Sequence, residues 1–436
     1  MQEILSFDRA PPISAPLRFF LTAPLFAIAA GGLLLWSGPD LFTSRWTPAA
    51  LALTHLITAG FMMQVMLGAL QQLLPVMAGA NIARPLLVAT VVHAMITLGA
   101  LCLVTAFLVN QPWLFGSAVI FMSTGVFTLV LAAAHALVGV PTTSPIIRGL
   151  RLALVGLSVT VSIGLLQAVV RGWSLSLPIV PLANVHLGWG FVAWGCALLG
   201  AVGFVAVPMF QQTPSYPSWF GRGYGYATLG LVVAWTAAEL LRWDGAASVL
   251  SVGVVLMAAS FAGTTLYLQR QSKRPTFDAV HRLWWVAMVS ALAACALWVA
   301  AQVVPILGQW QGWPLLFGTL VLFGGFMSVM VGMLYKIVPF LIWLHLQNRG
   351  LGRLVAPNMK KVLVQSLIDR QTAAHFCAFT LLLLAVVWPQ WFVYPAGVAL
   401  VFANGWLLHN LISAVRVYRA HMAKIALLEA SSAVVS

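Results

Sequence analysis

The chain contains 436 residues, of which 61% are hydrophobic and only 7% are charged, whereas an ordinary soluble domain is about 25% charged. This composition excludes a soluble enzyme and predicts an all-α membrane protein that crosses the bilayer many times. The net charge is +14. In a membrane protein an excess of Lys and Arg is typical of cytoplasmic loops, so the charge does not indicate binding to nucleic acid.

Twelve apolar stretches are long enough to cross the bilayer as transmembrane helices. They are residues 15–37, 49–77, 84–109, 112–138, 148–172, 180–210, 222–243, 245–270, 280–304, 312–346, 371–393 and 396–420. The first stretch lacks the basic start and the small-residue cleavage site of a secretory signal, so we expect it to stay in the mature chain. No connection is long enough for a soluble domain, and residues 1–436 are expected to form one transmembrane domain.

The basic residues lie predominantly on one side of these twelve stretches. All but three of the 22 Lys and Arg residues fall on the side of the N-terminus, and the three on the other side are Arg45, Arg171 and Arg242. Cytoplasmic loops are enriched in Lys and Arg. We therefore expect both termini to be cytoplasmic and the protein to reside in a bacterial inner (plasma) membrane.

Three stretches resemble one another, namely residues 55–76, 186–210 and 319–340. Each ends near a proline, and an arginine opens the preceding stretch. The corresponding pairs are Arg18 and Pro75, Arg151 and Pro208, and Arg282 and Pro339. The prolines are 133 and 131 residues apart. This internal periodicity predicts three four-helix repeats, at approximately 15–138, 148–270 and 280–420, in three similar arcs around pores or pockets.

Two histidines open the first two of these three stretches. His55 is followed five residues later by a Gly-Phe pair, and His186 is followed four residues later by another. Together with twelve helices in three arcs, this pattern resembles the catalytic subunit (subunit I) of the haem-copper oxidases, and most closely the cbb3-type and nitric-oxide-reductase branch. The resemblance covers the whole chain by topology and about three helices by motif. It implies that His55 ligates a haem b and that His186 ligates copper or iron.

Other ligands of that family are missing from this chain. The adjacent histidine pair of the family's helix seven is absent from residues 235–240, and the His-x-His of its helix ten is replaced by Phe317, Gly318 and Thr319. An oxygen-reducing centre needs three nitrogen ligands on its non-haem metal and an axial histidine on the reacting haem. One of these four remains, so we do not expect oxygen reduction. The divergent single-chain relatives, including nitric-oxide-response membrane proteins, are the better comparison.

The orientation places His55, His186 and Glu239 at one level, in the outer third of the bilayer. Glu239 is the only acid well inside a stretch, and an intramembrane carboxylate is by default a functional candidate. We select His55 and His186 as cofactor-binding residues and His186 and Glu239 as metal ligands. On the residues alone, either histidine could instead hydrogen-bond to a neighbouring helix. Glu239 could also form an ion pair with Arg242 at the outer interface.

The helical faces that carry the two histidines differ. Residues 59, 62 and 66 share a face with His55 and are Ala, Met and Met, an apolar wall that would suit the flat side of a porphyrin. Residues 190, 193 and 197 share a face with His186 and are Gly, Ala and Ala. Such small residues either leave space beside the imidazole or let two helices approach closely.

Four further histidines, on the inner half of their stretches, are only weakly indicated as a second metal or haem site: His93, His135, His375 and His409.

The sequence favours a haem-associated membrane protein, without oxidase turnover, that acts in nitric-oxide or metal stress. A transporter with Glu239 as its proton or cation site is a different class that also fits twelve helices with internal repeats. A third class is an assembly partner or subunit of a respiratory complex, and a homo-oligomer is compatible with each class. In every case the lipid bilayer is the main partner.

Overall fold

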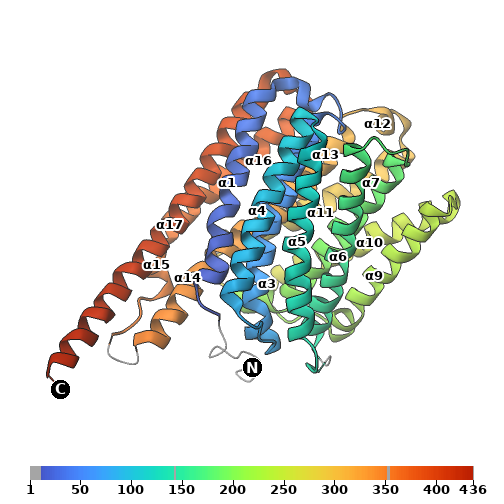
Figure 1. The fold of residues 1–436 in the computed structure, drawn as a ribbon. Coiled ribbons are helices and arrows are strands. Elements are labelled where there is room, and N and C mark those ends of the chain that lie inside the picture. The colour runs from blue at the N-terminus through green and yellow to red at the C-terminus, as the bar shows by residue number, and fades with distance from the viewer. Residues whose placement is uncertain (1–10, 142–143, 351–353, 436) are drawn as a thin grey trace.

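The computed structural model describes residues 11–141, 144–350 and 354–435, and this part of the chain is helical apart from short connections (Figure 1). It contains no strand. The elements are α1 (Ser14–Ser37), η3 (Gly38–Thr43), α2 (Pro48–His55), η4 (Leu56–Met62), α3 (Met63–Ala78), α4 (Pro85–Val109), α5 (Pro112–Ala136), α6 (Pro145–Gly172), α7 (Ile179–Gly188), η5 (Trp189–Cys196), α8 (Ala197–Gln211), α9 (Ser218–Leu240), α10 (Asp244–Gln269), α11 (Ala279–Val303), α12 (Pro305–Gln309), α13 (Trp313–Thr319), η6 (Leu320–Met327), α14 (Ser328–Gly350), α15 (Met359–Val362), α16 (Gln365–Val387) and α17 (Pro389–Val435).

Each predicted apolar stretch corresponds to a long helical segment of the structure. Three of these segments are composite and consist of α2, η4 and α3, of α7, η5 and α8, and of α13, η6 and α14. Among the described residues, eleven helical segments are long and apolar enough to cross a membrane. The twelfth predicted stretch corresponds to α9, which is helical and is not among the eleven. The protein is therefore an all-α membrane protein.

The boundary between the last two helices differs from the prediction. The sequence suggested a break between residues 393 and 396, next to Pro395. In the structure α16 ends at Val387 and Pro389 opens α17, whereas Pro395 lies inside α17. The N–H of the first helical residue has no intrahelical partner, so proline is tolerated there and marks a helix start. The first of the two prolines therefore sets the boundary.

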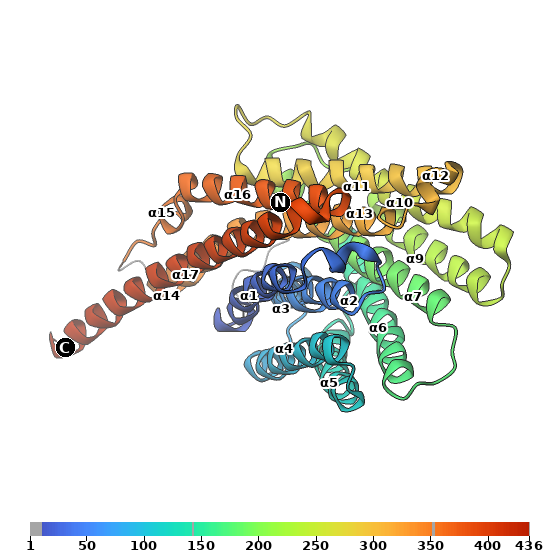
Figure 2. The ribbon, with the colours of Figure 1, turned by 90° about the horizontal axis from the view of Figure 1, so that it is seen from above.

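The first and last long helices lie side by side, as Figures 1 and 2 show from two directions. Their contact depends on two glycines, Gly31 on α1 and Gly397 on α17. A Cβ atom at Gly31 would lie 2.8 Å from the carbonyl oxygen of Gly397, and a Cβ at Gly397 would lie 3.0 Å from that of Gly31. Small residues let helix backbones approach this closely in membrane proteins. The contact closes the bundle.

Three segments of the described chain are π-helical, and they occur in the three stretches whose sequences resemble one another. They are η4, η5 and η6, which begin at Leu56, Trp189 and Leu320. The starts are separated by 133 and 131 residues, the same separations as between the three prolines. π-Helical turns are rare and occur frequently at functional sites. Their regular recurrence directs attention to the space between these three helices.

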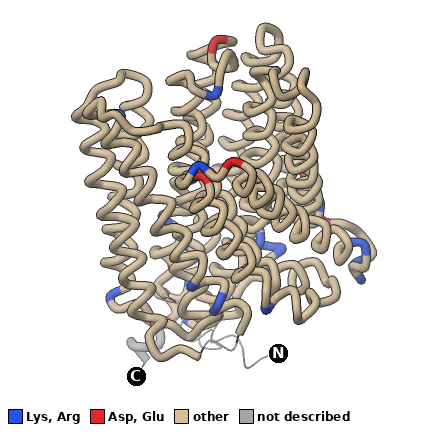
Figure 3. Tube along the Cα trace, turned by 90° about the vertical axis from the view of Figure 1, so that its right-hand side faces the viewer, with Lys and Arg blue, Asp and Glu red and all other residues tan. Residues whose placement is uncertain are grey.

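Basic residues gather at one end of the bundle. In Figure 3 most Lys and Arg positions lie in the half where α1 begins and α17 ends, and few lie at the opposite end. The asymmetry agrees with the distribution on which the orientation prediction is based. Residues 1–10 and 436, whose cytoplasmic placement was predicted, lie outside the described residues.

A small ionic cluster at the basic end joins the start of α11 to α14 and to the connection before α11. Asp278, the residue that caps α11, accepts hydrogen bonds from Arg274 at 2.6 Å and from Lys336 of α14 at 2.9 Å. Its other carboxylate oxygen accepts the backbone N–H of His281 at 2.9 Å. Burial alone would raise the pKa of Asp278, but the His281 N–H, Lys336 and Arg274 together hold this pKa below its ordinary value. The carboxylate is therefore stabilised in its ionised form.

Substitution of Asp278 by asparagine is expected to destabilise the protein by about 1–3 kcal/mol at pH 7, because two charge-assisted hydrogen bonds are lost. Asparagine caps a helix as well as aspartate does, so the cap is retained and the charge is tested alone. A carboxyl with a depressed pKa stabilises the fold above its ordinary pKa, and this contribution is lost as the pH falls through the folded-state value. The midpoints of thermal unfolding of the wild type and Asp278→Asn should therefore differ at pH 7, and the difference should disappear as the pH falls below about 4. An equal difference at both pH values would contradict this explanation.

Candidate cofactor-binding cavity

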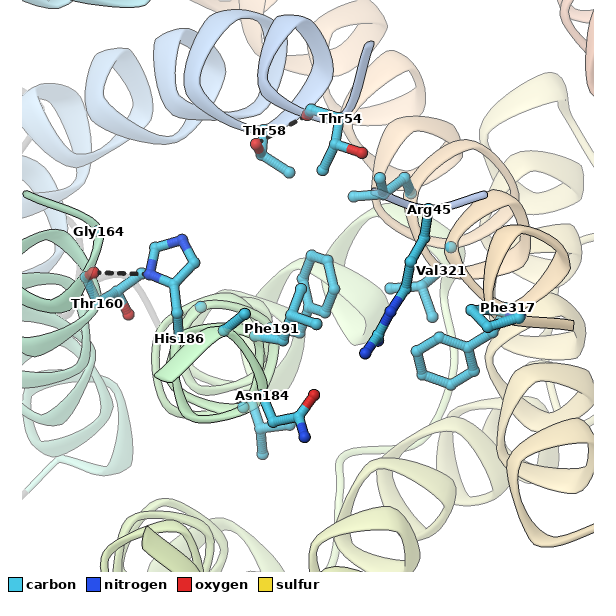
Figure 4. Close-up of a pocket in the computed structure, with 18 of the residues that line it drawn as sticks. Arg45, Thr54, Thr58, Thr160, Gly164, Asn184, His186, Phe191, Phe317 and Val321 are labelled. Atoms are coloured by element: carbon cyan, nitrogen blue, oxygen red, sulfur yellow. Dashed lines mark hydrogen bonds between the residues drawn. The ribbon is translucent and has the colours of Figure 1, made fainter. Parts of the chain in front are cut away.

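A cavity of about 1150 Å³ lies in the half of the bundle away from the basic end, between the helices that contain η4, η5 and η6 (Figure 4). Ligand pockets in proteins usually measure about 300–1,000 Å³, so this cavity has room for a large ligand. His55, His186 and Glu239 all line it. The three residues selected from the sequence, which belong to separate spans, are thus brought to one cavity.

His55 is positioned by the start of α2. Thr47 caps this helix by accepting the N–H of Ala50 at 3.1 Å, and Pro48 occupies its first position. The imidazole Nδ1 of His55 lies 2.8 Å from the carbonyl oxygen of Leu51, one turn earlier. A carbonyl oxygen only accepts, so Nδ1 donates its proton. In a neutral ring the lone pair is then on Nε2, which makes no hydrogen bond within the described part of the chain.

His186 has the same arrangement with a different partner. Its Nδ1 donates to the carbonyl oxygen of Thr160, on α6, at 3.0 Å. The ring packs beside Gly164, where a Cβ atom would lie 2.8 Å from the imidazole Cε1. Figure 4 shows the ring between this glycine and the open cavity. His186 therefore does hydrogen-bond to a neighbouring helix, as the sequence allowed, and it does so through Nδ1. As in His55, Nε2 has no partner within the described part of the chain.

The two histidines thus share the tautomer in which Nε2 is open to a metal. A ligating histidine almost always donates its second ring N–H to a carboxylate, a backbone carbonyl or water, which fixes the ring and leaves the other nitrogen for the metal. His55 and His186 each have such a carbonyl partner. Either Nε2 could therefore serve as an axial ligand to a haem iron or as a copper ligand.

The apolar face predicted next to His55 lines the cavity. Ala59, Met62 and Met66 belong to the lining, and Met63 joins them. Met63 is one position beyond the expected helical spacing, because η4 intervenes and a π-helical turn contains more residues than an α-helical turn. The wall is therefore broader than regular α-helical periodicity predicts.

The small residues next to His186 have mixed roles. Gly190 lines the cavity, whereas Ala193 packs against α6. A Cβ atom at Gly156 of α6 would lie only 2.1 Å from the carbonyl oxygen of Ala193. Gly156 and Ala193 therefore let α6 and η5 approach closely, which is one of the two roles that the sequence left open for the small residues.

Glu239 lines the cavity from α9 and is half-buried. Its carboxylate forms no ion pair in the described structure, so the predicted pairing with Arg242 is not found there. The only hydrogen bond between the two residues joins the Arg242 N–H to the Glu239 backbone oxygen at 3.3 Å. The carboxylate is thus available to a ligand, a cation or a proton.

Residues of the two segments in which the sequence lacks the expected histidines also reach this cavity. Phe317, Gly318 and Thr319 line it, as does Trp235. The Thr319 hydroxyl donates to the carbonyl oxygen of Leu315 at 2.8 Å, so it is engaged within its own helix. The corresponding wall of the cavity is therefore apolar and offers no histidine.

Sequence reasoning did not single out several charged and polar residues of the lining, among them Arg45, Arg171, Asn184 and Asp244. Arg45 lies in the connection between η3 and α2, and Figure 4 shows its side chain extending into the cavity, with Asn184 on the opposite side. Residues of a connection carry no helical periodicity. The one available signal was that Arg45 is among the three basic residues on the side opposite the N-terminus.

Two of the four remaining intramembrane histidines are engaged by hydroxyl groups in the described structure. His93 shares a hydrogen bond of 2.8 Å with the Thr22 hydroxyl, and His375 shares one of 2.9 Å with the Ser328 hydroxyl. Within the described ranges, no group of three or more His, Cys, Asp or Glu side chains is arranged to hold a metal ion.

Comparison with known proteins gives no family assignment, since no protein-family model and no curated protein matches this sequence.

Proposed function

We propose that the cavity binds haem b and that the protein is a haem-associated membrane protein related in plan to the haem-copper oxidase catalytic subunit, without oxygen reduction. One observation carries this proposal. His55 and His186 line the same cavity, and each has its Nδ1 committed to a backbone carbonyl, so that the Nε2 lone pair remains for a metal.

The residues present fit a haem in three respects. The cavity is large, its walls are mostly apolar, and the Met62 and Met66 side chains supply a polarisable surface for the flat side of a porphyrin. His55 would be the axial ligand, and His186 would be the second nitrogen ligand, on iron or on copper. Thr319 offers no ligand because its hydroxyl is bonded within its helix. If His186 binds copper rather than the iron, a haem held by His55 alone would be able to take up a diatomic molecule such as nitric oxide, which is the basis for a role in nitric-oxide or metal stress.

The repeat prediction belongs to the same proposal. The separations of η4, η5 and η6 equal those of Pro75, Pro208 and Pro339, which supports three four-helix repeats of a haem-copper-oxidase-like plan. The cavity would then lie where corresponding helices of the three repeats meet. The clustering of basic residues at one end supports cytoplasmic termini in a bacterial inner membrane.

The absorbance spectrum of the purified protein tests the proposal. We expect a Soret band in protein prepared from haem-replete cells, sharper α and β bands after reduction with dithionite, and a shift of the Soret band under carbon monoxide. The pyridine haemochrome spectrum should identify haem b. A colourless preparation that also takes up no added haem would refute the proposal.

A transporter is the second candidate, and a specific observation favours it. Glu239 is a half-buried carboxylate on the cavity wall and has no ion pair among the described residues. Intramembrane acids of this kind mark proton and cation pathways. Loss of proton-coupled uptake in proteoliposomes on Glu239→Gln, together with a colourless protein, would favour transport over haem binding.

A further inference from the structure

Arg45 places a positive charge at the outer end of an apolar cavity. The residue lies just before α2, where the Thr47 cap and Pro48 fix the path of the chain. Its guanidinium carbon lies 4.6 Å from the centre of the Trp46 ring, and the side chain extends into the cavity in Figure 4. This stacking holds the planar group in place while its edge stays free to donate.

No carboxylate neutralises this charge in the described structure. The ion pairs there involve other basic residues, at Arg274, Arg282, Lys336 and Arg349. Burial lowers the pKa of the Arg45 guanidinium, which indicates that water solvates it incompletely. A partly buried charge without a partner is costly. An anion bound beside Arg45 would remove this cost.

The surroundings of Arg45 define the chemistry of that anion. Phe317 and Asn184 line the same cavity as Arg45, and their side chains are labelled with it in Figure 4. The Asn184 side chain makes no hydrogen bond within the described part of the chain. The same cavity is also lined by Met62, Met63 and Met66. A ligand that satisfies both parts has an acidic end and a large apolar body.

We propose that Arg45 binds the carboxylate of an amphipathic ligand whose apolar body occupies the cavity. Arginine suits this role because its fork of N–H donors matches the two oxygens of a carboxylate. The carboxylate has two sources, a porphyrin propionate or a fatty acid. Only the first source rests on the proposed haem function.

The test compares ligands that differ only in the acid group, on the full-length protein in lipid nanodiscs. Wild type, Arg45→Met and Arg45→Lys are titrated with haemin, with haemin dimethyl ester and with radiolabelled oleate. Arg242→Met is the matched control, since Arg242 lies on the same side of the protein and outside the cavity lining. All variants are first checked for a monodisperse gel-filtration peak.

Arg45→Met is expected to weaken haemin or oleate binding about 10- to 100-fold, the range that corresponds to a charge-assisted hydrogen bond. Binding of the dimethyl ester should be unchanged, Arg45→Lys should give an intermediate loss, and Arg242→Met should bind as the wild type does. The proposal would be overturned if the wild type bound haemin and its dimethyl ester equally well. It would also be overturned if Arg45→Met bound haemin and oleate as tightly as the wild type does, or if the wild type bound neither acid.

The outcomes separate this inference from the haem proposal. Oleate binding that depends on Arg45, in a protein that takes up no haem, would support the carboxylate site and refute the haem function. Haem uptake that is insensitive to the Arg45 substitution and to esterification would support the haem function and refute the carboxylate site.

Discussion

Replacement of His55 by alanine is expected to remove most of the haem from the purified protein, to below about a tenth of the wild-type content. Loss of a partner that merely orients a metal ligand typically costs 10–100-fold in affinity, and this substitution removes the proposed ligand itself. The remaining wall offers the engaged Thr319 hydroxyl and no further histidine on its helix. Haem content is measured as pyridine haemochrome per mole of protein, beside the carbon-monoxide difference spectrum.

Two further variants make this result specific. His186→Ala should change the carbon-monoxide spectrum or lower the haem content, because its Nε2 is the second free imidazole nitrogen on the cavity. His93→Ala is the matched control, since His93 is bonded to Thr22 and is not part of the lining. If His55→Ala and His186→Ala both keep full haem with an unchanged spectrum, the ligand lies elsewhere and the resemblance fails at both positions.

The second large effect is expected from Gly156→Ala. The added Cβ would lie 2.1 Å from the carbonyl oxygen of Ala193 and 2.4 Å from its carbonyl carbon. Both atoms belong to the backbone of η5, so rotation of a side chain cannot relieve the clash. Overpacking a helix contact commonly costs 1–3 kcal/mol, and a clash with backbone should reach or exceed the upper end of about 3 kcal/mol. The midpoint of thermal unfolding, followed by gel filtration after heating, should fall accordingly.

Gly263→Ala provides the comparison for this substitution. It lies inside α10, and no atom would lie within 4 Å of its Cβ. Alanine is a better helix former than glycine by about 0.5–1 kcal/mol, so this variant should be as stable as the wild type or slightly more stable. Equal midpoints for both variants would show that the α6 to η5 contact is looser than the structure indicates.

The positions of the helices could be predicted from the sequence because apolarity and length determine which segments lie in the bilayer. The stretch predicted at 84–109 is α4, at Pro85–Val109, and the one predicted at 112–138 is α5, at Pro112–Ala136. The π-helical segments were not predictable in this way. Residues 56–62 have an ordinary apolar composition, and a widened turn depends on packing against other helices rather than on the residues themselves.

Three of the residues that line the cavity were selected from the sequence, whereas their hydrogen bonding could not be predicted. Depth in the bilayer placed His55, His186 and Glu239 at one level, and they line one cavity. The tautomer of each imidazole depends on a carbonyl group, that of Thr160 in the case of His186, whose approach only the packed helices determine. Arg45 escaped prediction because a residue between helices belongs to no apolar periodicity.

The π-helical segments also determine the direction in which the cavity residues point. His55 and Thr319 immediately precede η4 and η6, and His186 lies three residues before η5. Successive α-helical residues are rotated by about 100° around the helix axis, and a π-helical segment accommodates residues that a regular helix would place further round that axis. Each of these side chains is therefore out of phase with the part of its own helix that follows the π-helical segment. The parts that follow can keep their best packing angle while the preceding parts turn toward a common centre, so the lining can change without disturbing the packing of the rest of the helix.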